Sequence, residues 1–380
     1  MYSLAFLALT SFVASFLLTP LVRNLARRLG WVDQPDRGRR IHAQPVPRLG
    51  GLPIFASYVL AIGFLLLSPL AAADIVRTGL PLAARILPAA ALVFAVGLVD
   101  DLRGVKPWQK LTAQLMAGGI AFWAGVQISS VAGFSLPFWL SLPVTLIWLA
   151  GCSNAFNLID GVDGLAAGAG LFATLTILLG ALLHGNMPLA LATVPVAGAL
   201  LGFLRYNFNP ASIFLGDSGS LTLGFLLGCY AVLWGQKSAT MLGMTAPLMA
   251  LAVPLLDTLV AVGRRFLRGQ PIYVADRAHI HHRLLDRGLT PRRVVLLLYA
   301  ACGLAAALSL LASVSRNEIK GLIIVLFCAG AWLGIQHLGY VEFSLAGRMF
   351  FDGAFRQHLR QQLALQTFRH GLAAAVTLEQ

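Results

Sequence analysis

Acidic side chains are scarce in this sequence. Only 15 of the 380 residues are Asp or Glu, and all charged residues together make up 11% of the chain, whereas soluble domains carry about 25%. Hydrophobic residues account for 58% of the chain, and its mean hydropathy is +0.79. This composition excludes an intrinsically disordered chain and argues against an ordinary soluble domain. It is typical of a protein embedded in a membrane.

Cysteine is also rare, and two nucleotide-binding motifs are missing. The four cysteines lie in or at the end of apolar runs and form no CxxC pair, which excludes a disulfide-rich secreted domain. The chain contains neither a P-loop nor a GxGxxG motif, so ATP hydrolysis is not expected. Its net charge of +13 comes from basic residues placed between long apolar segments. That placement indicates membrane topology, and we expect no nucleic-acid partner.

Long apolar runs predict an all-α, polytopic integral membrane protein with about eleven transmembrane helices. Each run is long enough to cross a hydrocarbon core of about 30 Å, and helices satisfy the backbone polar groups within lipid. The expected spans are 2–22, 50–70, 81–98, 111–128, 136–153, 165–183, 187–204, 219–235, 241–262, 294–313 and 319–338. We expect residues 1–338 to form the membrane-embedded domain and residues 339–380 to form a cytoplasmic C-terminal tail.

The distribution of charge predicts the orientation of these helices. With the N-terminus outside, 23 of the 28 Lys and Arg residues fall on the cytoplasmic side, as the positive-inside rule requires. On the same map, 13 of the 15 acidic residues also fall on that side, although no insertion rule places them there. The outer loops are short and almost without polar residues. We therefore expect the active site on the cytoplasmic face.

Two cytoplasmic segments combine carboxylates with basic groups. In the first loop, His42 and Arg48 lie among prolines and glycines, where anion binding and a plain topology role are equally reasonable interpretations. Asp100 and Asp101 end the third predicted helix, and Lys110 opens the next. Two carboxylates at a helix C-terminus oppose the helix dipole, so a bound cation or a catalytic role is favoured there.

The segment NAFNLIDGVDG contains four polar side chains within ten residues. Asn154 and Asn157 can share one helix face, and so can Asn157 and Asp160, but the four cannot all do so. The glycines are expected to end the helix and to let Asp160 and Asp163 turn into a common pocket. Hydrogen bonding between neighbouring helices would explain one of the asparagines but not the whole group.

Two further segments complete the set of unusual residues. Asp217 precedes an apolar helix, so it can cap that helix, ligate a metal ion, or do both. Asp257 lies within the ninth predicted helix, where an ionisable residue is a functional candidate by default. The sequence DRAHIHHRL resembles a zinc site, but no cysteine is near and arginines flank it. A cluster of His and Arg is better suited to a diphosphate.

Together these segments predict a phosphoryl-transfer site. Carboxylate and carboxamide oxygens suit Mg²⁺, with Mn²⁺ as an alternative, and the basic residues suit phosphates. A metal, phosphates and a cationic clamp are the usual parts of a phosphoryl-transfer site. Its position at the membrane surface indicates one lipid substrate and one cytosolic substrate.

The motifs HAQPVPRLGG, VDDLRGVKPWQK, NAFNLIDGVDGLAAG, RYNFNPASIFLGDSGS and DRAHIHHRL occur in this order. They resemble those of the polyprenyl-phosphate N-acetylhexosamine-1-phosphate transferase superfamily over about residues 1–338, and within it the branch of WecA and TagO. The resemblance implies transfer of N-acetylglucosamine-1-phosphate from UDP-GlcNAc to undecaprenyl phosphate with release of UMP, as the first membrane step of a cell-surface polysaccharide pathway. It places the protein in the bacterial cytoplasmic membrane among membrane lipids, and a homodimer is a further option.

The resemblance also implies roles for individual residues. Asn157 and Asp217 would hold Mg²⁺ together with the diphosphate of the nucleotide sugar. Asp100 would be the candidate base on the lipid phosphate, Asp101 would help to organise metal and substrate, and Lys110 would hold the lipid phosphate. The expected catalytic set is therefore Asp100, Asp101, Asp217 and Lys110.

The expected substrate-binding set is larger. The resemblance implies that Phe214 and Asp163 contact uracil and that the histidines lie around the phosphates. Arg48 matches an arginine in the family's first cytoplasmic loop. The other members come from the residue pattern. The full set is Arg48, His42, Asn154, Asp160, Asp163, Phe214, His279, His281, His282 and Arg283. The alternatives are a phospho-MurNAc-pentapeptide transferase of peptidoglycan synthesis and, from another class, a transporter or inactive binder of polyprenyl phosphate.

Overall fold

The computed structural model describes residues 2–33, 45–67, 82–131, 134–236, 244–270, 279–340, 360–361 and 363–365. The described chain is almost entirely helical, as the apolar runs predict. The helices are α1 (Tyr2–Arg28), α2 (Gly51–Leu67), α4 (Leu82–Arg103), α5 (Pro107–Trp123), α6 (Phe138–Ile159), α7 (Leu165–Leu183), α8 (Met187–Asn207), α9 (Gly216–Gln236), α10 (Thr245–Ala250), α11 (Ala252–Arg268), α12 (Ile280–Asp286), α13 (Pro291–Val314) and α14 (Asn317–His337).

Two short hairpins interrupt the helices. Strand β1 (Val32–Asp33) pairs antiparallel with β2 (Val46–Pro47), and β3 (Ser130–Val131) pairs antiparallel with β4 (Phe134–Ser135). The β1–β2 pair closes the base of the first expected cytoplasmic loop, so it sets where that loop returns to α2.

Seven of the described helices are long and apolar enough to cross a membrane: α1, α6, α7, α8, α9, α13 and α14. A helix also occupies each of the other expected spans, but α2 is shorter. The all-α, multi-pass architecture is therefore supported, while the count of eleven crossings stays a prediction. The ninth expected span is divided, because α10 ends at Ala250 and α11 starts at Ala252.

Helix α9 forms the centre of the molecule. Every residue from Ser218 to Gly235 is buried, and α4, α6, α7 and α2 pack around it. Within this core the hydroxyl groups of Tyr58 on α2 and Tyr230 on α9 lie 3.0 Å apart, and Tyr230 also donates to the carbonyl of Ala192 on α8. These bonds satisfy polar groups that would be costly to leave unpaired in an apolar interior.

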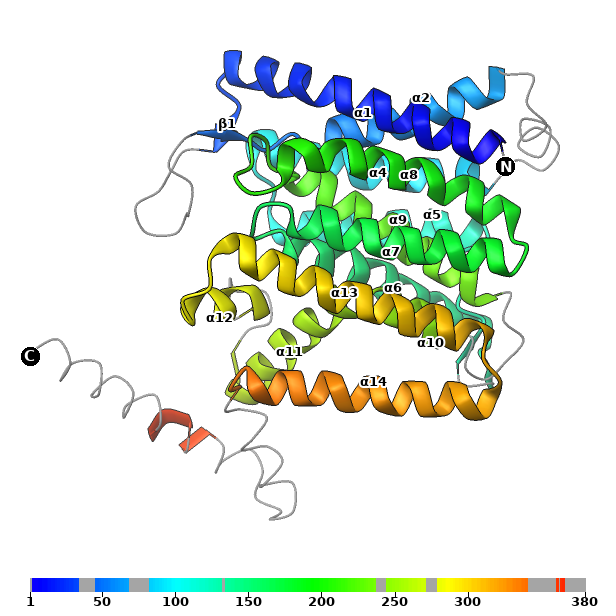
Figure 1. The fold of residues 1–380 in the computed structure, drawn as a ribbon, viewed down its shortest axis with the longest axis vertical. Coiled ribbons are helices and arrows are strands. Elements are labelled where there is room, and N and C mark those ends of the chain that lie inside the picture. Colours follow the sequence, from blue (N-terminus) through cyan, green and yellow to red (C-terminus); the bar gives the residue numbers. More distant parts are fainter. Residues whose placement is uncertain are drawn as a thin grey trace, which may run out of the picture.

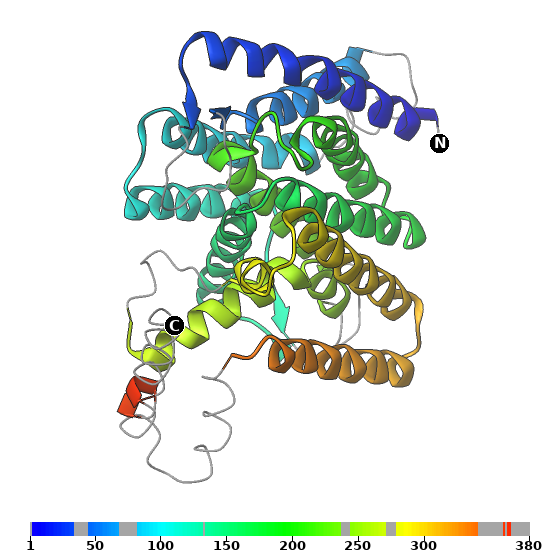
Figure 2. The ribbon, with the colours of Figure 1, turned by 60° about the vertical axis from the view of Figure 1, so that its left-hand side comes forward.

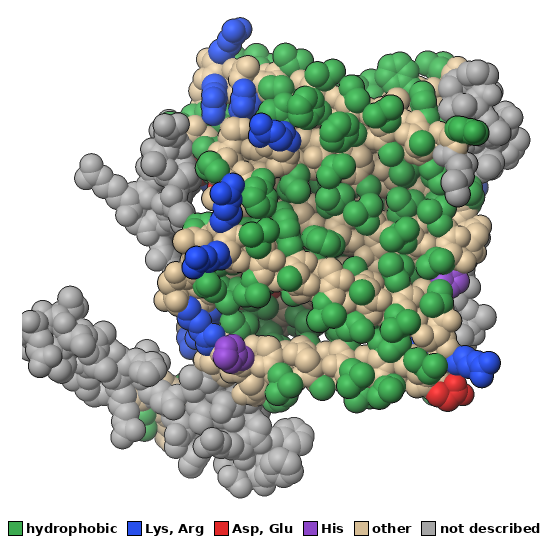
Figure 3. All heavy atoms as spheres, in the orientation of Figure 1, with side chains coloured by type: hydrophobic (Ala, Val, Ile, Leu, Met, Phe, Trp, Pro, Cys, Tyr) green, Lys and Arg blue, Asp and Glu red, His purple; other side chains and the backbone are tan. Residues whose placement is uncertain are grey.

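Most of the long helices lie roughly side by side, with α1 at one edge and α14 at the other (Figure 1). In the turned view α11 runs obliquely to them (Figure 2). Apolar side chains cover much of the face in Figure 3, whereas most of its visible basic side chains lie along the edge where β1 and α12 are found in Figure 1. This separation of charge supports the predicted grouping of the basic loops at one end of the bundle.

Candidate active site

The first residues of α9 are packed against the loop that enters α2. The backbone N–H groups of Gly50 and Gly51 donate to the carbonyls of Phe214 and Leu215, and Phe214 N–H donates to Pro47. Gly216 has a φ of 73°, and a side chain there would collide with the carbonyl of Arg48. Glycine is therefore required at this position, and the contact fixes the place where α9 begins.

Asp101 caps the N-terminus of α9. Its carboxylate accepts hydrogen bonds from the backbone N–H groups of Asp217 (2.8 Å) and Ser218 (2.9 Å) and from the Ser218 hydroxyl (2.6 Å). A carboxylate at a helix N-terminus satisfies otherwise unpaired N–H groups and interacts favourably with the helix dipole. Asp101 therefore holds the backbone of Asp217 in place.

Lys110 contacts two carboxylates beside this N-terminus, those of Asp100 and Asp217. Together with Asp101 these residues form the group called here the Lys110 cluster. The Nζ of Lys110 lies 3.1 Å from Oδ2 of Asp100 and 2.8 Å from Oδ2 of Asp217. The other oxygen of Asp217, Oδ1, accepts a hydrogen bond from Nδ2 of Asn157 at 3.0 Å. The structure thus brings together, from α4, α5, α6 and α9, the residues expected to hold metal and lipid phosphate.

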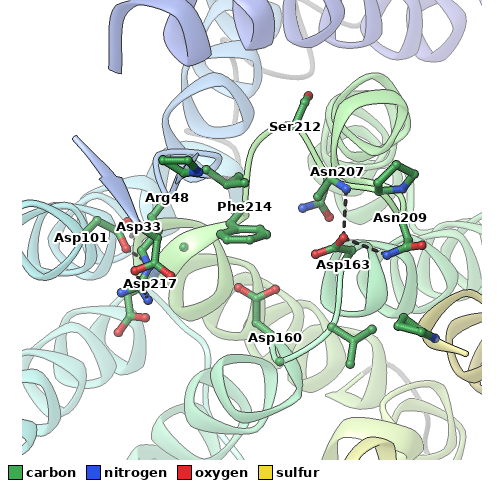
Figure 4. Close-up of a pocket in the computed structure, with 18 of the residues that line it drawn as sticks. Asp33, Arg48, Asp101, Asp160, Asp163, Asn207, Asn209, Ser212, Phe214 and Asp217 are labelled. Atoms are coloured by element: carbon green, nitrogen blue, oxygen red, sulfur yellow. Dashed lines mark hydrogen bonds and ion pairs between the residues drawn. The ribbon is translucent and has the colours of Figure 1, made fainter. Parts of the chain in front are cut away.

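A cavity of about 780 Å³ opens beside this cluster. Asp101 and Asp217 line one side, where Arg48 forms an ion pair of 2.7 Å with Asp33. Figure 4 shows this group at one side of the cavity, Asp163 and Asn209 at the other, and the ring of Phe214 between them. The cavity wall therefore carries both acidic and basic side chains at one end and an aromatic ring near its middle.

The far side of the cavity is organised around Asp163. One of its oxygens accepts hydrogen bonds from Nδ2 of Asn209 (3.0 Å) and from the backbone N–H of Ala211 (2.9 Å). These bonds link the turn after α6 to the loop between α8 and α9. The helix α6 ends at Ile159, as the glycines predict, and this turn places both Asp160 and Asp163 in the cavity wall.

Asp160 lies between the two ends of the cavity (Figure 4). Burial and the negative charges of Asp217, Asp101 and Asp163 raise the pKa of the Asp160 carboxyl well above its usual range, although Arg48 opposes this effect. A carboxyl with a raised pKa can stay protonated and donate a hydrogen bond. Asp160 can therefore serve as a hydrogen-bond donor within the cavity wall.

Among the described residues of the histidine segment, one contributes to the cavity wall. His282 lines the cavity, whereas Nδ1 of His279 is bonded to Asp257 at 2.9 Å. His281 is fully buried against Gly161, and neither ring nitrogen has a hydrogen-bond partner among the described residues. Burial lowers the pKa of His281 to about 3, so this ring is neutral near pH 7. Of the three histidines, His282 is therefore the one that a ligand in the cavity can contact.

Two other expected binding residues, Asn154 and Arg283, are not part of the cavity wall. Asn154 does not line the cavity; its amide pairs with Gln114 on α5 and donates to the carbonyl of Ala150. This is the interhelical bonding that sequence reasoning allowed for one of the asparagines. The guanidinium of Arg283 stacks on the ring of Tyr340, 4.7 Å from its centroid. His42 lies outside the described residues.

Comparison with known proteins identifies the family. The model of glycosyl transferase family 4 matches residues 83–235. The probable undecaprenyl-phosphate N-acetylglucosaminyl 1-phosphate transferase of Bacillus subtilis is 36% identical over 302 residues, which are 77% of this chain and 80% of that protein. The decaprenyl-phosphate N-acetylglucosaminephosphotransferase of Mycobacterium tuberculosis is 36% identical over 332 residues, covering 80% and 81%. The chain belongs to glycosyl transferase family 4.

A more distant relative agrees with this assignment. The undecaprenyl-phosphate alpha-N-acetylglucosaminyl 1-phosphate transferase of Escherichia coli is 28% identical over 346 residues, covering 85% of this chain and 89% of that protein. The resemblance inferred from the five motifs is thereby confirmed. The part of the chain matched by the family 4 model extends from α4 to α9, so it contains Asp100, Lys110, Asn157, Asp163 and Asp217.

Several contributors to this family 4 site were not among the residues expected from sequence. Asn207 and Asn209 lie in the cavity wall, and Asp33 pairs with Arg48. The two asparagines stand in the same motif as Asp217, so their position was a usable signal. The partnership of Asp33 with Arg48 was not predictable, because it depends on the fold of the β1–β2 hairpin.

The residues at the acidic end fit a divalent cation with oxygen ligands. Asp217 and Asn157 face each other, and the amide oxygen of Asn157 can replace its nitrogen by rotation of the side chain. The positive Nζ of Lys110 already lies between two carboxylates, which shows that this point attracts a cation. Among the described residues no three His, Cys, Asp or Glu side chains form a metal cluster. A cation here would therefore rely on Asp217, Asn157 and substrate oxygens.

Proposed function

We propose that this protein transfers N-acetylglucosamine-1-phosphate from UDP-GlcNAc to undecaprenyl phosphate and releases UMP. Relatives that share 36% and 28% of their residues with most of this chain carry names for this transfer to undecaprenyl phosphate. The product would begin the membrane stage of a cell-surface polysaccharide. The observation that carries the proposal is the Lys110 cluster, with its paired carboxylates, beside a cavity that has a second polar end.

The dimensions and lining of the cavity support a nucleotide sugar as the donor. Its volume of about 780 Å³ lies within the range of small-molecule sites. Phe214 offers an aromatic face on which a uracil ring can stack, and Asp163 and Asn209 offer hydrogen-bonding groups nearby. The diphosphate would then lie toward Asp217, Arg48 and His282.

The transfer exchanges one phosphoanhydride bond for another. An oxygen of the lipid phosphate attacks the phosphorus that bears the sugar, and the bond from that phosphorus to the bridging oxygen of UMP breaks. The second pKa of a phosphate monoester is near 6, so the attacking group is largely dianionic at neutral pH and needs little help from a base. The harder task is to bring two anions together. Lys110, on the lipid-phosphate side, would supply a positive charge for it.

The carboxylates can contribute in two ways. In a single in-line displacement, Asp100 positions Lys110, and Asp101 fixes the backbone at Asp217. A covalent aspartyl-phosphate on Asp217 or Asp100 is the alternative route. We favour the single displacement, because the ion pairs of Lys110 with both carboxylates reduce their nucleophilicity.

We further propose that Mg²⁺, or Mn²⁺ in its place, is held by Asp217 and Asn157 with the donor diphosphate. Such an ion neutralises phosphate charge and polarises the phosphorus–oxygen bonds. It prefers oxygen ligands and retains several water molecules, so two protein ligands are sufficient. The cavity would face the cytoplasm of a bacterium, where the nucleotide sugar is made, and this orientation rests on the 23 basic residues of the predicted inner loops.

The experiment is a donor comparison with purified full-length protein, undecaprenyl phosphate and Mg²⁺. UMP release is measured with UDP-GlcNAc, UDP-GalNAc and UDP-MurNAc-pentapeptide supplied separately. We expect release with UDP-GlcNAc and at most traces with the muramyl-pentapeptide donor. Equal or greater release with the pentapeptide donor would contradict the proposal, and a preference for UDP-GalNAc would change only the sugar epimer.

A further inference from the structure

Helix α11 carries a buried carboxylate that the proposed reaction does not use directly. Asp257 is 2% exposed. One of its oxygens lies 2.9 Å from Nδ1 of His279, and the other accepts a hydrogen bond of 2.7 Å from the backbone N–H of Ile280. Burying a carboxylate is costly unless it is hydrogen-bonded, so both bonds are important for keeping Asp257 in this position.

These two bonds fix the start of the helix that presents His282 to the cavity. His279 is the N-cap residue of α12, and Ile280 is its first residue. The first N–H groups of a helix have no partner within the helix, and Asp257 satisfies one of them from a different helix. His282 follows two residues after Ile280, so a shift of this anchor would move His282 relative to the cavity wall.

The hydrogen bond to Asp257 also selects the tautomer of the His279 ring. A carboxylate can only accept hydrogen bonds, so Nδ1 of His279 must carry the proton and donate it to Asp257. In the neutral ring, Nε2 is then an acceptor. A carboxylate partner commonly fixes the tautomer and orientation of a functional histidine in this way.

The three imidazole rings are in contact, which links the anchor to the cavity. The rings of His279 and His281 are stacked with centroids 5.7 Å apart, and those of His281 and His282 are 4.3 Å apart. His281 in turn packs on Gly161 in the turn after α6. The ring of His279 is therefore the first member of a packed series that ends at the cavity.

We propose that Asp257 is a positioning residue for this histidine series, acting through His279 by fixing its tautomer and through Ile280 by fixing the start of α12. The inference rests on the proposed function, because it assigns the series to the phosphate end of the same site. A simpler interpretation is that Asp257 only caps α12. That interpretation requires nothing of the carboxylate charge, because an amide oxygen at the same place can accept the Ile280 N–H equally well.

Asp257→Asn separates the two interpretations. Asparagine keeps the size of the side chain and one oxygen for Ile280, but its NH₂ group meets Nδ1 of His279 as a donor. His279 must then move or adopt the opposite tautomer. Loss of an orienting partner typically lowers activity 10–100-fold, so we expect a fall of that size in kcat, with thermal unfolding close to that of the wild type. Asp257→Glu, which keeps the charge, should recover part of the loss.

A double-mutant cycle distinguishes action through His279 from a purely structural role of Asp257. If Asp257 acts through His279, then Asp257→Asn should lower activity less than about twofold when it is introduced into the His279→Ala protein. Wild-type kcat in Asp257→Asn would overturn the proposal. So would an equal fractional loss in both backgrounds, because the two side chains would then act independently.

A spectroscopic measurement keeps this test separate from the identity of the sugar donor. Nitrogen-15 spectra of histidine-labelled protein, assigned with His279→Gln, should show His279 protonated at Nδ1 in the wild type and not in Asp257→Asn. A neutral His279 protonated at Nε2 in the wild type would overturn the inference. If this spectrum is as expected but no nucleotide sugar is consumed, the proposed function fails while the contact and its tautomer stand.

Discussion

At the scale of single residues, the candidate site depends on how four charged groups share a small volume. Asp100 and Asp217 both contact Lys110, and Asp101 uses its oxygens on the N-terminus of α9. Asp100 and Asp217 therefore share one cation, whereas Asp101 is paired with backbone N–H groups, and these partners explain how the three acids can lie together. Of these three carboxylates, Asp217 is the one that both lines the cavity and accepts a hydrogen bond from an amide side chain, that of Asn157.

Asp217→Asn tests the importance of that charge. The amide preserves the shape of the side chain but removes the negative charge that pairs with Lys110 and that would hold a divalent cation. We expect UMP release to fall at least about 100-fold, while the protein is still inserted in the membrane at its normal level. Steady-state turnover at saturating Mg²⁺ is the measurement. Asp286→Asn, an exposed position at the end of α12, is the matched control and should leave turnover unchanged.

His281 predicts a particular dependence of stability on pH. Its pKa is about 3 in the folded protein and near 6.5 when exposed, so folding favours the neutral ring. Stability from this ring is complete above pH 6.5 and is lost as the pH falls toward 3. At pH 5 the loss should be about 2 kcal/mol.

The check is thermal unfolding of detergent-solubilised protein between pH 7.5 and pH 5. We expect the wild type to lose stability across this range and His281→Leu, which cannot be protonated, to lose measurably less. Equal slopes for the two proteins would show that His281 is not buried in neutral form.

Several residues that the sequence marked as candidates lie together in the structure, but their individual partners were not predictable. The motifs marked four polar residues near helix ends, and the structure brings these together: Asp100, Lys110, Asn157 and Asp217. Asn154 has the same polarity, yet it faces Gln114, since its helix face points to α5. Whether a polar residue at a helix end faces a cavity or a neighbouring helix is decided by the rotation of that helix. The sequence does not specify that rotation.

At the scale of elements, close helix crossings set the position of Asp217. A side chain on Gly97 of α4 would come within 2.6 Å of the carbonyl oxygen of Asp217 and of the Cα of Ser218. Backbone atoms cannot move aside as a flexible side chain can. The small residue at 97 therefore permits α4 and α9 to approach closely enough for Asp101 to cap α9.

Gly97→Ala should separate these two helices. Overpacking of this kind costs about 1–3 kcal/mol, and we expect a larger effect on turnover than on folding because the first residues of α9 are displaced. Gly63→Ala on α2 is the control, since a methyl group there meets no atom within 4 Å and alanine favours a helix. The expected result is loss of UMP release only for Gly97→Ala; normal release would mean that the crossing tolerates the extra methyl group.

The helices themselves were largely predictable, because apolar runs between polar breaks define their ends. The division of the ninth span at Leu251 was not predicted. Apolar residues lie on both sides of it, so hydropathy carries no signal of the break. The oblique α11 that follows places Asp257 beside α12, and this contact could not be foreseen from a continuous transmembrane helix.

At the scale of the whole molecule, one end of the helix bundle holds the cavity, the histidine series and most basic residues seen in Figure 3. Arg316, in the connection between α13 and α14, lies at the opposite end of α13 from Asp286. The charge distribution predicts that the Asp286 end is cytoplasmic. Orientation is a property of the membrane as well as of the chain, so the fold alone does not supply it.

Cysteine labelling tests this orientation. On a background without the four native cysteines, an impermeant maleimide should label Arg316→Cys in intact cells but should label Asp286→Cys only after the membrane is opened. Both positions are exposed, so a difference between them reports sidedness. Labelling of Asp286→Cys from outside would reverse the layout and remove access of the site to a cytosolic nucleotide.

We infer that the Lys110 cluster catalyses reversible transfer of a sugar phosphate to a lipid phosphate. The most direct measurement is isotope exchange: membranes containing the protein are incubated with unlabelled UDP-GlcNAc, undecaprenyl phosphate, Mg²⁺ and radiolabelled UMP. Because one phosphoanhydride is exchanged for another, the wild type is predicted to return label to UDP-GlcNAc, and Asp217→Asn to return none above background. Absence of exchange in the wild type, with both substrates present, would contradict the claim.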